Sequence, residues 1–179
     1  MNASASGAFN PDEWIAPKEQ RRMDTFIQYG LVAATFAVED SGWKPKDTKE
    51  LTRTGVMIGS GIGGLPEIEN SARVVNEGNI RKLSPYFIPA SIINLVSGQV
   101  AIKYGFKGPN HAVVTACASG AHAIGDAARL IIFDDADVMI AGGAEAAICR
   151  LGVAGFARAR ALSTSFNDTP ENASRPWDI

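Results

Sequence analysis

Short apolar strands alternate with longer helical segments along this chain, and that alternation restricts it to folds in which helices cover a sheet. Three apolar runs predict buried strands, at residues 54–60, 111–115 and 137–141. Apolar residues at helical spacing predict helices, over residues 17–41, 65–76, 92–104 and 121–133. Pro17 suits a first helical position, and helix ends are expected at Gly42, Gly78 and Gly105. The sequence therefore predicts an α/β protein with a polar, loop-like tail over residues 163–179.

Length and charge favour a single soluble domain. With 179 residues, 46% of them hydrophobic, the chain can bury one core. Its 17 Lys plus Arg against 19 Asp plus Glu argue against an obligate nucleic-acid binder. No apolar run approaches the roughly 20 residues that span a bilayer, and residues 1–7 lack a secretory signal pattern. We expect a flexible lead-in over residues 1–10, one domain over 11–179 and a cytoplasmic protein.

One cysteine lies where a predicted strand runs into a predicted helix. The sequence around Cys117 reads VVTACASGAHAIGDAA, so the turn consists of Ala, Ser and Gly. Small neighbours allow a tight turn and let a substrate carbonyl approach closely. Free N–H groups at the helix start favour a thiolate and can hold a developing oxyanion. The pattern predicts a nucleophile suited to thioesters; the alternative is a small hydrophobic residue at a strand end.

No convincing proton-transfer group accompanies this cysteine. His122 falls near the opposite side of the helix, and His111 lies too far along the strand, so we expect satisfied or surface histidines. Cys149 sits in an apolar run and is predicted to be a core residue. Neither a CxxC nor an HxxxH spacing occurs, so we expect free thiols, no zinc site and no cofactor.

The glycine run and the basic clusters can each be explained by structure alone, without a binding function. The glycine run at residues 59–64 reads GSGIGG, which lacks the spacing of a dinucleotide-binding loop. A backbone packed closely against another segment explains it better. Basic residues cluster near Lys18 and recur at Arg81-Lys82 and near Arg160. These clusters are expected to be solvated helix faces, with an acidic partner as the alternative.

Several blocks of the sequence resemble the elongating β-ketoacyl-acyl carrier protein synthases of fatty-acid biosynthesis, closest to the synthase II type. The block around Cys117 reads ACASGAHAIGDAARLI. Other blocks follow the family order: KEQRRMDTFIQYG, IGSGIGGL, RKLSPYFIPASIINLVSGQVAIKYGFKGPN, DADVMIAGGAEAAI, LGVAGFARARALS and SRPWD. The resemblance covers residues 13–178. It implies a thiolase-like fold, layered α-β-α-β-α in the full protein, of which this chain is mainly part of the N-terminal half.

The resemblance also implies a reaction and its residues. Cys117 would accept an acyl group from acyl carrier protein, and a carbanion from decarboxylated malonyl-acyl carrier protein would attack that group. The Cys117 amide would form one side of the oxyanion hole.

Residues matched to the acyl-chain tunnel are Ile62, Gly152 and Phe156, together with Phe87, which reaches in from a partner subunit. Residues matched to a basic surface for the carrier protein are Lys18, Arg21 and Arg22, with Arg81, Lys82 and Arg160 as weaker matches. A homodimer through residues 112–115 is implied.

Several parts of the family pattern have no counterpart in this sequence. Three strands with helices on both faces would leave sheet edges bare, so we expect partner strands outside this sequence and truncation at both ends. The family's two decarboxylation histidines, a structural lysine and the second oxyanion amide have no counterpart here, and Ile179 replaces a charged residue. We expect this chain alone to become acylated at most. The rival hypotheses are a catalytically dead fragment and a thiolase that uses coenzyme A thioesters.

Overall fold

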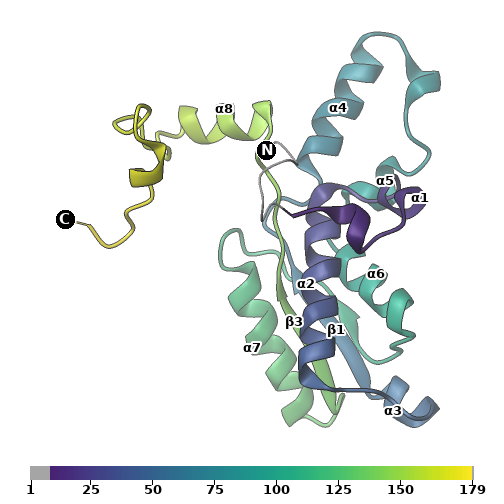
Figure 1. Cartoon of the computed structure of the whole chain (residues 1–179). Coiled ribbons are helices and arrows are strands. Elements are labelled where there is room, and N and C mark those ends of the chain that lie inside the picture. The colour runs from purple at the N-terminus through teal and green to yellow at the C-terminus, as the bar shows by residue number, and fades with distance from the viewer. Residues whose placement is uncertain (1–8, 179) are drawn as a thin grey trace. The chain divides into compact units, whose positions relative to one another are not determined.

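The computed structural model describes residues 9–178 (Figure 1), so most of the expected lead-in lies outside the described residues. The chain divides into two compact units, Met1–Ala147 and Ile148–Ile179, which we describe separately. The elements of the first unit, in chain order, are η1 (Pro11–Glu13), α1 (Pro17–Gln20), α2 (Thr25–Ser41), α3 (Thr48–Thr52), β1 (Thr54–Gly59), α4 (Leu65–Asn76), η2 (Ile80–Lys82), α5 (Phe87–Ser91), α6 (Leu95–Tyr104), β2 (Asn110–His111), α7 (Ser119–Ile132) and β3 (Val138–Gly143). The second unit holds α8 (Arg150–Arg158) and η3 (Pro170–Asn172).

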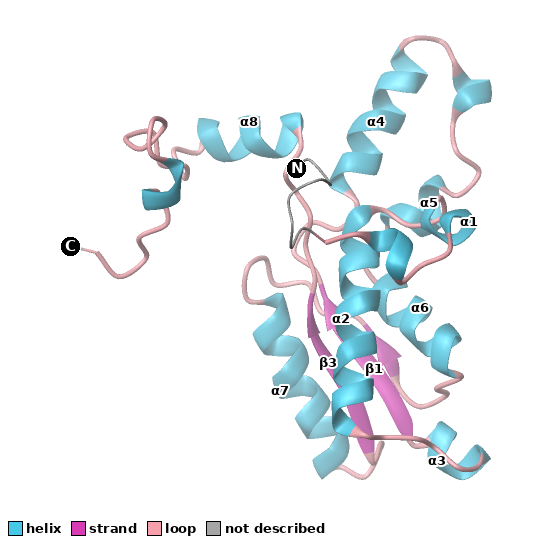
Figure 2. Cartoon of the chain, viewed as in Figure 1, coloured by secondary structure: helices cyan, strands magenta, loops and turns pink. Residues whose placement is uncertain are grey.

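The first unit is built on a parallel sheet of three strands in the order β2-β1-β3. Strand β1 pairs with β3 from Thr54↔Val138 to Gly59↔Gly143, and with β2 at Val56↔Asn110 and Met57↔His111. Helix α7 contacts β1 and β3, while α6 contacts β1 and α2 contacts β3. Figure 2 shows α7 on one side of the strands and α2 with α6 on the other. The predicted α/β architecture is confirmed.

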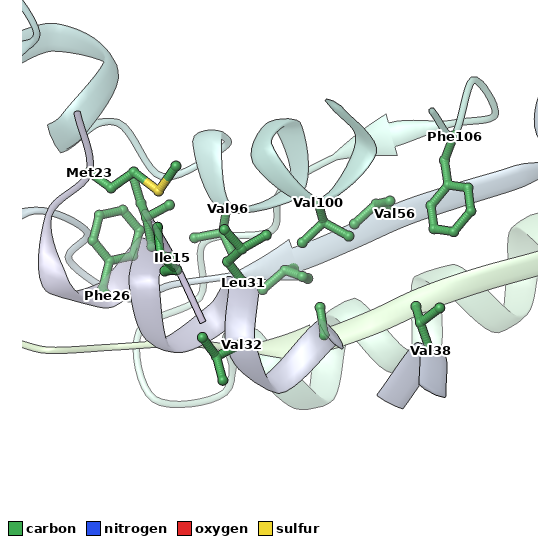
Figure 3. Packing of buried hydrophobic residues seen from close by; sticks show 13 residues of the cluster. Ile15, Met23, Phe26, Leu31, Val32, Val38, Val56, Val96, Val100 and Phe106 are labelled. Atoms are coloured by element: carbon green, nitrogen blue, oxygen red, sulfur yellow. The ribbon is translucent and has the colours of Figure 1, made fainter. Parts of the chain in front are cut away.

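Both faces of β1 are buried, as is typical of a central parallel strand. On one face, Val56 packs with Phe26 of α2 and with Val96 and Val100 of α6 in the main core cluster (Figure 3). On the other face, Met57 packs with Ala123 and Ala127 of α7. The alternation of neighbouring β1 side chains between the two clusters follows from the pleat of a strand. The sheet therefore separates a large core from a smaller one lined by alanines.

Two predicted elements are wrong in extent. The segment predicted as one helix over residues 17–41 is two helices, because Asp24 has extended backbone (φ −63°, ψ 161°) and its side chain accepts the Phe26 N–H as an N-cap. The strand predicted at residues 111–115 pairs with β1 only up to His111. Farther along, the Thr115 N–H donates to the Ser119 side chain, so this backbone belongs to a turn and not to the sheet.

The other predicted elements are confirmed, with ends shifted by up to three residues: α6 begins three residues later than predicted, α7 begins two residues earlier, and β3 ends two residues later. Helix α4 has the predicted bounds, and β1 ends one residue early. Pro17 opens α1, while Gly42 and Gly105 cap α2 and α6 with left-handed backbone, at φ 66° and 71°. The short helices α3 and α5 and the nine-residue helix α8 were not predicted. Within residues 163–178 the only helical turn is η3, which fits the predicted loop-like tail.

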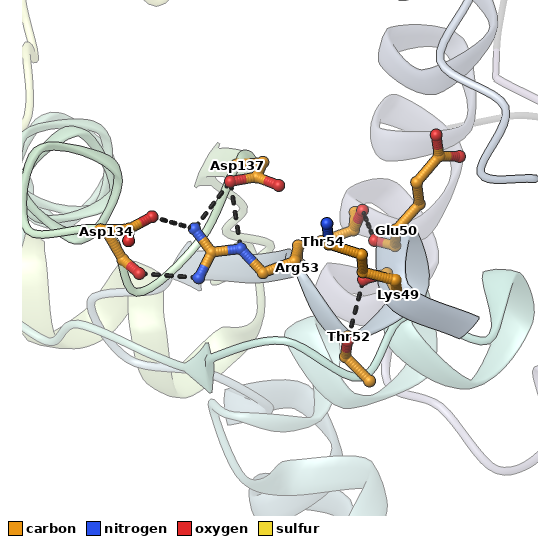
Figure 4. A network of polar contacts seen from close by, with 7 residues as sticks. All are labelled: Lys49, Glu50, Thr52, Arg53, Thr54, Asp134 and Asp137. Carbon is orange, nitrogen blue, oxygen red and sulfur yellow. Dashed lines mark hydrogen bonds and ion pairs between the residues drawn. The ribbon is translucent and has the colours of Figure 1, made fainter. Parts of the chain in front are cut away.

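Arg53 ties the start of β1 to the turn between α7 and β3 (Figure 4). Its Nε and Nη2 donate to one carboxylate oxygen of Asp137, at 3.0 and 2.7 Å. Its Nη1 donates to the main-chain oxygen of Asp134 at 2.7 Å, and its Nη2 also pairs with the Asp134 carboxylate. The guanidinium holds the pKa of Asp137 below its ordinary value through these hydrogen bonds. Asp134 has left-handed backbone (φ 63°), which this contact helps to hold.

The buried carboxylate of Asp24 caps two helices at once. Its Oδ1 accepts the Phe26 N–H at 3.3 Å, and its Oδ2 accepts the Glu67 N–H in the first turn of α4 at 2.9 Å. Burial raises the pKa of Asp24, and the nearby charge of Glu145 adds to the rise, while the N–H groups oppose it. Asp24 thus joins α2 to α4 close to Glu145.

Replacing Asp24 with asparagine is expected to lower the free energy of unfolding by about 1–2 kcal/mol at neutral pH, because one N–H loses its acceptor. The folded pKa of Asp24 lies above its unfolded value. The folded wild type therefore binds this proton first and gains stability from this group as pH falls between those two values. The variant lacks that gain, so its deficit should widen on acidification. Urea unfolding across this range, with Asp40→Asn as the exposed control, measures both effects; an unchanged deficit would contradict the assignment.

Candidate active site

The turn that carries Cys117 is held by Ser119. The Ser119 hydroxyl accepts the Thr115 N–H at 2.9 Å and donates to the main-chain oxygen of Ala116 at 2.7 Å. Ser119 is buried, and its N–H also reaches the Ala116 oxygen at 3.1 Å. Ala116 has left-handed backbone (φ 52°), which is uncommon for a residue other than glycine. Such backbone strain concentrates at functional sites.

Cys117 lies exposed at the top of this turn, one residue before Ala118, the N-cap of α7. Within the described part of the chain, its N–H donates no hydrogen bond to another residue. The first turn of α7 supplies further N–H groups at the positive end of the helix dipole. The predicted position of Cys117, at the bend before a helix, is confirmed, and the residue is exposed there. The arrangement can present a thiol and an N–H donor to the same carbonyl group.

The glycine run after β1 packs against the cysteine turn. A Cβ atom built on Gly61 would lie 3.1 Å from the carbonyl carbon and oxygen of Ala116, and one on Gly59 would lie 2.6 Å from the Val113 oxygen. On the neighbouring strand, a Cβ on Gly143 would lie 2.9 Å from the Gly120 Cα. Close backbone packing therefore excludes a side chain at Gly59 and Gly143 and leaves little room for one at Gly61, as predicted. Ile62, the tunnel candidate in this run, keeps 39% of its surface exposed.

Both histidines are exposed. The ring Nδ1 of His122 lies 2.7 Å from the Thr115 hydroxyl, a hydrogen bond that engages this ring within the turn. The main-chain oxygen of His111 accepts the Ser97 hydroxyl at 2.7 Å, which fixes β2 against α6. Both histidines therefore lie at the surface, as expected, and the His122 ring is also hydrogen-bonded. Residues 9–178 hold no cluster of His, Cys, Asp or Glu suited to a metal ion.

The other predicted site residues fall into both units. Phe87, half-buried, begins α5 in the first unit. Gly152 and Phe156 lie one turn apart on α8 in the second unit, so the structure does not relate them to Cys117. The core prediction for Cys149 is wrong: this residue is half-buried, and its sulfur caps α8 by accepting the Gly152 N–H at 3.5 Å. An N-cap position, unlike a core position, leaves the side chain at the helix end.

The basic candidates of the first unit come from two segments. Lys18 in α1 and Arg21 just after it are exposed, as are Arg81 and Lys82 in η2. Arg22 pairs with Glu19 at 3.3 Å and lies 5.0 Å from the ring centre of Tyr86, which follows η2 by four residues. The Arg22–Tyr86 contact therefore brings the α1 segment beside the segment between η2 and α5. Arg160, with left-handed backbone (φ 57°), lies after α8 in the second unit.

Sequence reasoning missed Glu145. This residue follows β3 by two positions, and its carboxylate accepts hydrogen bonds from the glycine run of residues 59–64. Its signal in the sequence is a single acidic residue between two alanines, directly after Gly142-Gly143-Ala144. Spacing alone could not assign that acid to a loop more than eighty residues earlier in the chain.

Comparison with known proteins decides the family. The family model "Beta-ketoacyl synthase, N-terminal domain" matches residues 4–178. The chain belongs to the β-ketoacyl synthase family. Among curated β-ketoacyl synthases, it is 55% identical over 174 residues to 3-oxoacyl-[acyl-carrier-protein] synthase 2 of Rhizobium meliloti, covering 97% of this chain and 41% of that protein. It is 52% identical over 175 residues to the mitochondrial synthase of Arabidopsis thaliana, covering 98% of this chain and 37% of that protein.

Solved ketosynthase structures agree with this assignment. A β-ketoacyl synthase from Burkholderia phymatum superposes with a TM-score of 0.82 at 27% identity, over 96% of this chain and 42% of that one. A ketosynthase in complex with its type II polyketide acyl-carrier protein gives 0.78 at 26% identity, over 87% and 44%. The predicted thiolase-like fold and the predicted family are confirmed. This β-ketoacyl synthase chain spans about two fifths of the length of those relatives.

Proposed function

We propose that the protein carrying this sequence is a 3-oxoacyl-acyl carrier protein synthase of fatty-acid biosynthesis, in which Cys117 accepts the acyl group. The exposed thiol on a strained turn before α7 carries the proposal. In the proposed reaction, the Cys117 sulfur attacks the thioester carbonyl of an acyl carrier protein and releases the carrier thiol. Malonyl-carrier protein then loses carbon dioxide, and the resulting carbanion attacks the acyl-enzyme, which frees the Cys117 sulfur and yields the 3-oxoacyl product.

The arrangement at the turn supports this role for Cys117. The N–H of Cys117 and the first turn of α7 face a carbonyl that approaches the sulfur, where negative charge develops on the oxygen. Small neighbours at Ala116 and Ala118 leave room for the thioester. The curated relatives named above are synthases that act on acyl carrier protein thioesters by name. From the resemblance in sequence, we propose Ile62, Gly152 and Phe156 as contacts of the acyl chain, and Phe87 as a contact that reaches in from a partner subunit.

Two assays test the proposal. Incubation with acyl-acyl carrier protein should add one acyl mass to the peptide that contains Cys117, as read by mass spectrometry. The 179-residue chain should stop there, because it holds no counterpart of the family's two decarboxylation histidines. Release of carbon dioxide from malonyl-acyl carrier protein by this chain alone would refute that second expectation. An absence of acyl mass on Cys117 would refute the proposed function.

Acyl carrier protein is the proposed macromolecular partner, recognised by the exposed basic residues around α1 and η2. Complementary charge steers such encounters and sets their salt dependence. We propose the exposed Lys18 and Arg21 as the main contacts, with Arg22, Arg81, Lys82 and Arg160 as additional ones. The solved ketosynthase complex with a carrier protein supports a partner of this class.

The double variant Lys18→Glu/Arg21→Glu is expected to weaken binding of acyl carrier protein by about tenfold or more at low ionic strength. Reversing two charges replaces attraction by repulsion, and wild-type binding should itself weaken as salt is raised. Calorimetric titration measures both. The matched control Lys44→Glu/Lys46→Glu makes the same charge change near α3, at the other end of the unit (Figure 1). Equal losses in the two variants would point to net charge and would contradict a localised docking surface.

Two further features belong to the proposal. We propose a homodimer formed through residues 112–115. These residues continue from the edge strand β2, and the outer side of β2 faces no other strand of the described sheet.

We propose a cytoplasmic location, although one relative is mitochondrial by name. Among the helices of residues 9–178, none combines the length and apolar character that a membrane crossing requires.

A further inference from the structure

Glu145 makes three hydrogen bonds to one short loop. Its Oε2 accepts the N–H groups of Gly61 and Ile62, each at 2.8 Å, and its Oε1 accepts the Ser60 hydroxyl at 3.1 Å. Hydrogen bonds to an ionised acceptor are roughly twice as strong as neutral ones. The carboxylate therefore clamps the start of the β1–α4 loop to the segment that follows β3, although 84 residues separate Gly61 from Glu145 in the sequence.

The loop that Glu145 holds also packs against the turn that carries Cys117. A Cβ on Gly61 would lie 3.1 Å from Ala116, the residue before Cys117, and 3.1 Å from the Glu145 carboxylate. Gly61 is thus held between the two. Ser60, buried at 2% exposure, extends the contact because its hydroxyl also accepts the Gly63 N–H at 3.1 Å. A shift of the carboxylate would move the whole loop relative to the sulfur.

Ile62 is the residue that such a shift would displace. Its N–H is bonded to Glu145 and its side chain is partly exposed. We propose that Glu145 is a positioning residue, which fixes the Ser60–Gly63 loop against the Cys117 turn. It thereby sets the position of Ile62, and the position of Ile62 determines how well an apolar tail attached to Cys117 is accommodated. In this proposal Glu145 acts through its hydrogen bonds to Ser60, Gly61 and Ile62. The inference rests on the proposed function only in taking that tail to be the acyl chain.

The test compares two reagents that alkylate a thiol without any catalysis. Chloroacetamide probes the sulfur alone, while N-dodecyl chloroacetamide also needs a place for its tail. All variants are made in a Cys149→Ala background of the protein carrying this sequence, so that only Cys117 is labelled. Wild type should react faster with the dodecyl reagent. Glu145→Gln places an NH₂ group where an oxygen accepted, so it should slow the dodecyl reagent by about tenfold, since misplacement by about 1 Å carries large penalties. The chloroacetamide rate should change by less than about twofold.

Controls separate positioning from stability. Glu39→Gln makes the same change at an exposed position on α2 and should leave both rates unaltered. Ser60→Ala removes one of the three contacts and should lower the ratio of rates in the same direction by a smaller factor. Thermal unfolding of each variant shows whether it is folded, and if Glu145→Gln is not, Ser60→Ala decides the matter together with Ile62→Ala, which should abolish much of the dodecyl preference.

The outcomes are distinct. A purely structural role for Glu145 predicts that both reagents slow equally or that neither slows, and either result would overturn the inference. Lack of dodecyl preference in the wild type would overturn it as well. If the dodecyl preference depends on Glu145 but no acyl group passes from acyl carrier protein to Cys117, the proposed function fails while the positioning role stands.

Discussion

Replacing Cys117 with alanine is expected to abolish acyl transfer from acyl carrier protein to this chain. The methyl group of alanine cannot form a thioester, so no covalent intermediate exists and the yield of acyl-protein should fall by more than about a thousandfold. Intact-mass spectrometry measures the yield directly. Folding should be unaffected, because Cys117 is exposed and the turn is held by Ser119.

Cys149→Ala is the matched control for that result. Cys149 caps α8 with its sulfur at 3.5 Å. Because sulfur is a weak hydrogen-bond acceptor, its loss should cost little stability and should leave acylation unchanged. Cys117→Ser offers a second comparison, since a hydroxyl keeps the shape of the side chain but is a far weaker nucleophile near neutral pH. Acyl mass found on the Cys149 peptide, or retained in Cys117→Ala, would contradict the assignment of the nucleophile.

Phe26→Ala is expected to lower the free energy of unfolding by about 3–5 kcal/mol. Phe26 has no exposed surface and lies in the main core cluster between α2, β1 and α6, so its removal leaves a cavity. Domains of this size are stable by only about 5–15 kcal/mol, so the loss is a large share of the total. Urea unfolding of wild type and variant measures the difference.

Phe36→Ala, on the same helix, is the control for Phe26. Phe36 is 49% exposed, and its ring meets that of Trp14 in a T-shaped arrangement with the ring centres 4.6 Å apart. Its loss should cost about 0.5–1.5 kcal/mol. Similar costs for the two substitutions would mean that the core is not centred on α2 as the structure has it.

Local signals were enough to predict the elements whose ends are marked by particular residues. Helix α4 lies between a glycine-rich turn and Gly78, whose left-handed backbone (φ 73°) ends it, and its bounds agree with the prediction. The break before α2 was not predictable in this way, because apolar residues continue at helical spacing through Asp24. What stops the helix there is a carboxylate that also accepts an N–H from α4, more than forty residues away.

The candidate site was predictable only in part, for the same reason. Cys117 is recognisable because the strand-like run, the small turn residues and the helix are adjacent in the sequence. The strand itself was overestimated, since Val113 and Val114 favour extended backbone but have no pairing partner in the sheet. Glu145 could not be assigned, because its partners Gly61 and Ile62 meet it only through the parallel pairing of β1 with β3.

The alanine face of α7 has a consequence for the reactivity of the cysteine. Ala123 and Ala127 are buried against β1 and β3, and their small size fixes how near the helix axis lies to the sheet. A larger side chain at either position would push the helix outward, because packed interiors accommodate extra methyl groups only by moving their neighbours. The thiol, two residues before the helix, would travel with it. Buried alanines beneath the helix therefore help to determine where the Cys117 sulfur lies at the surface.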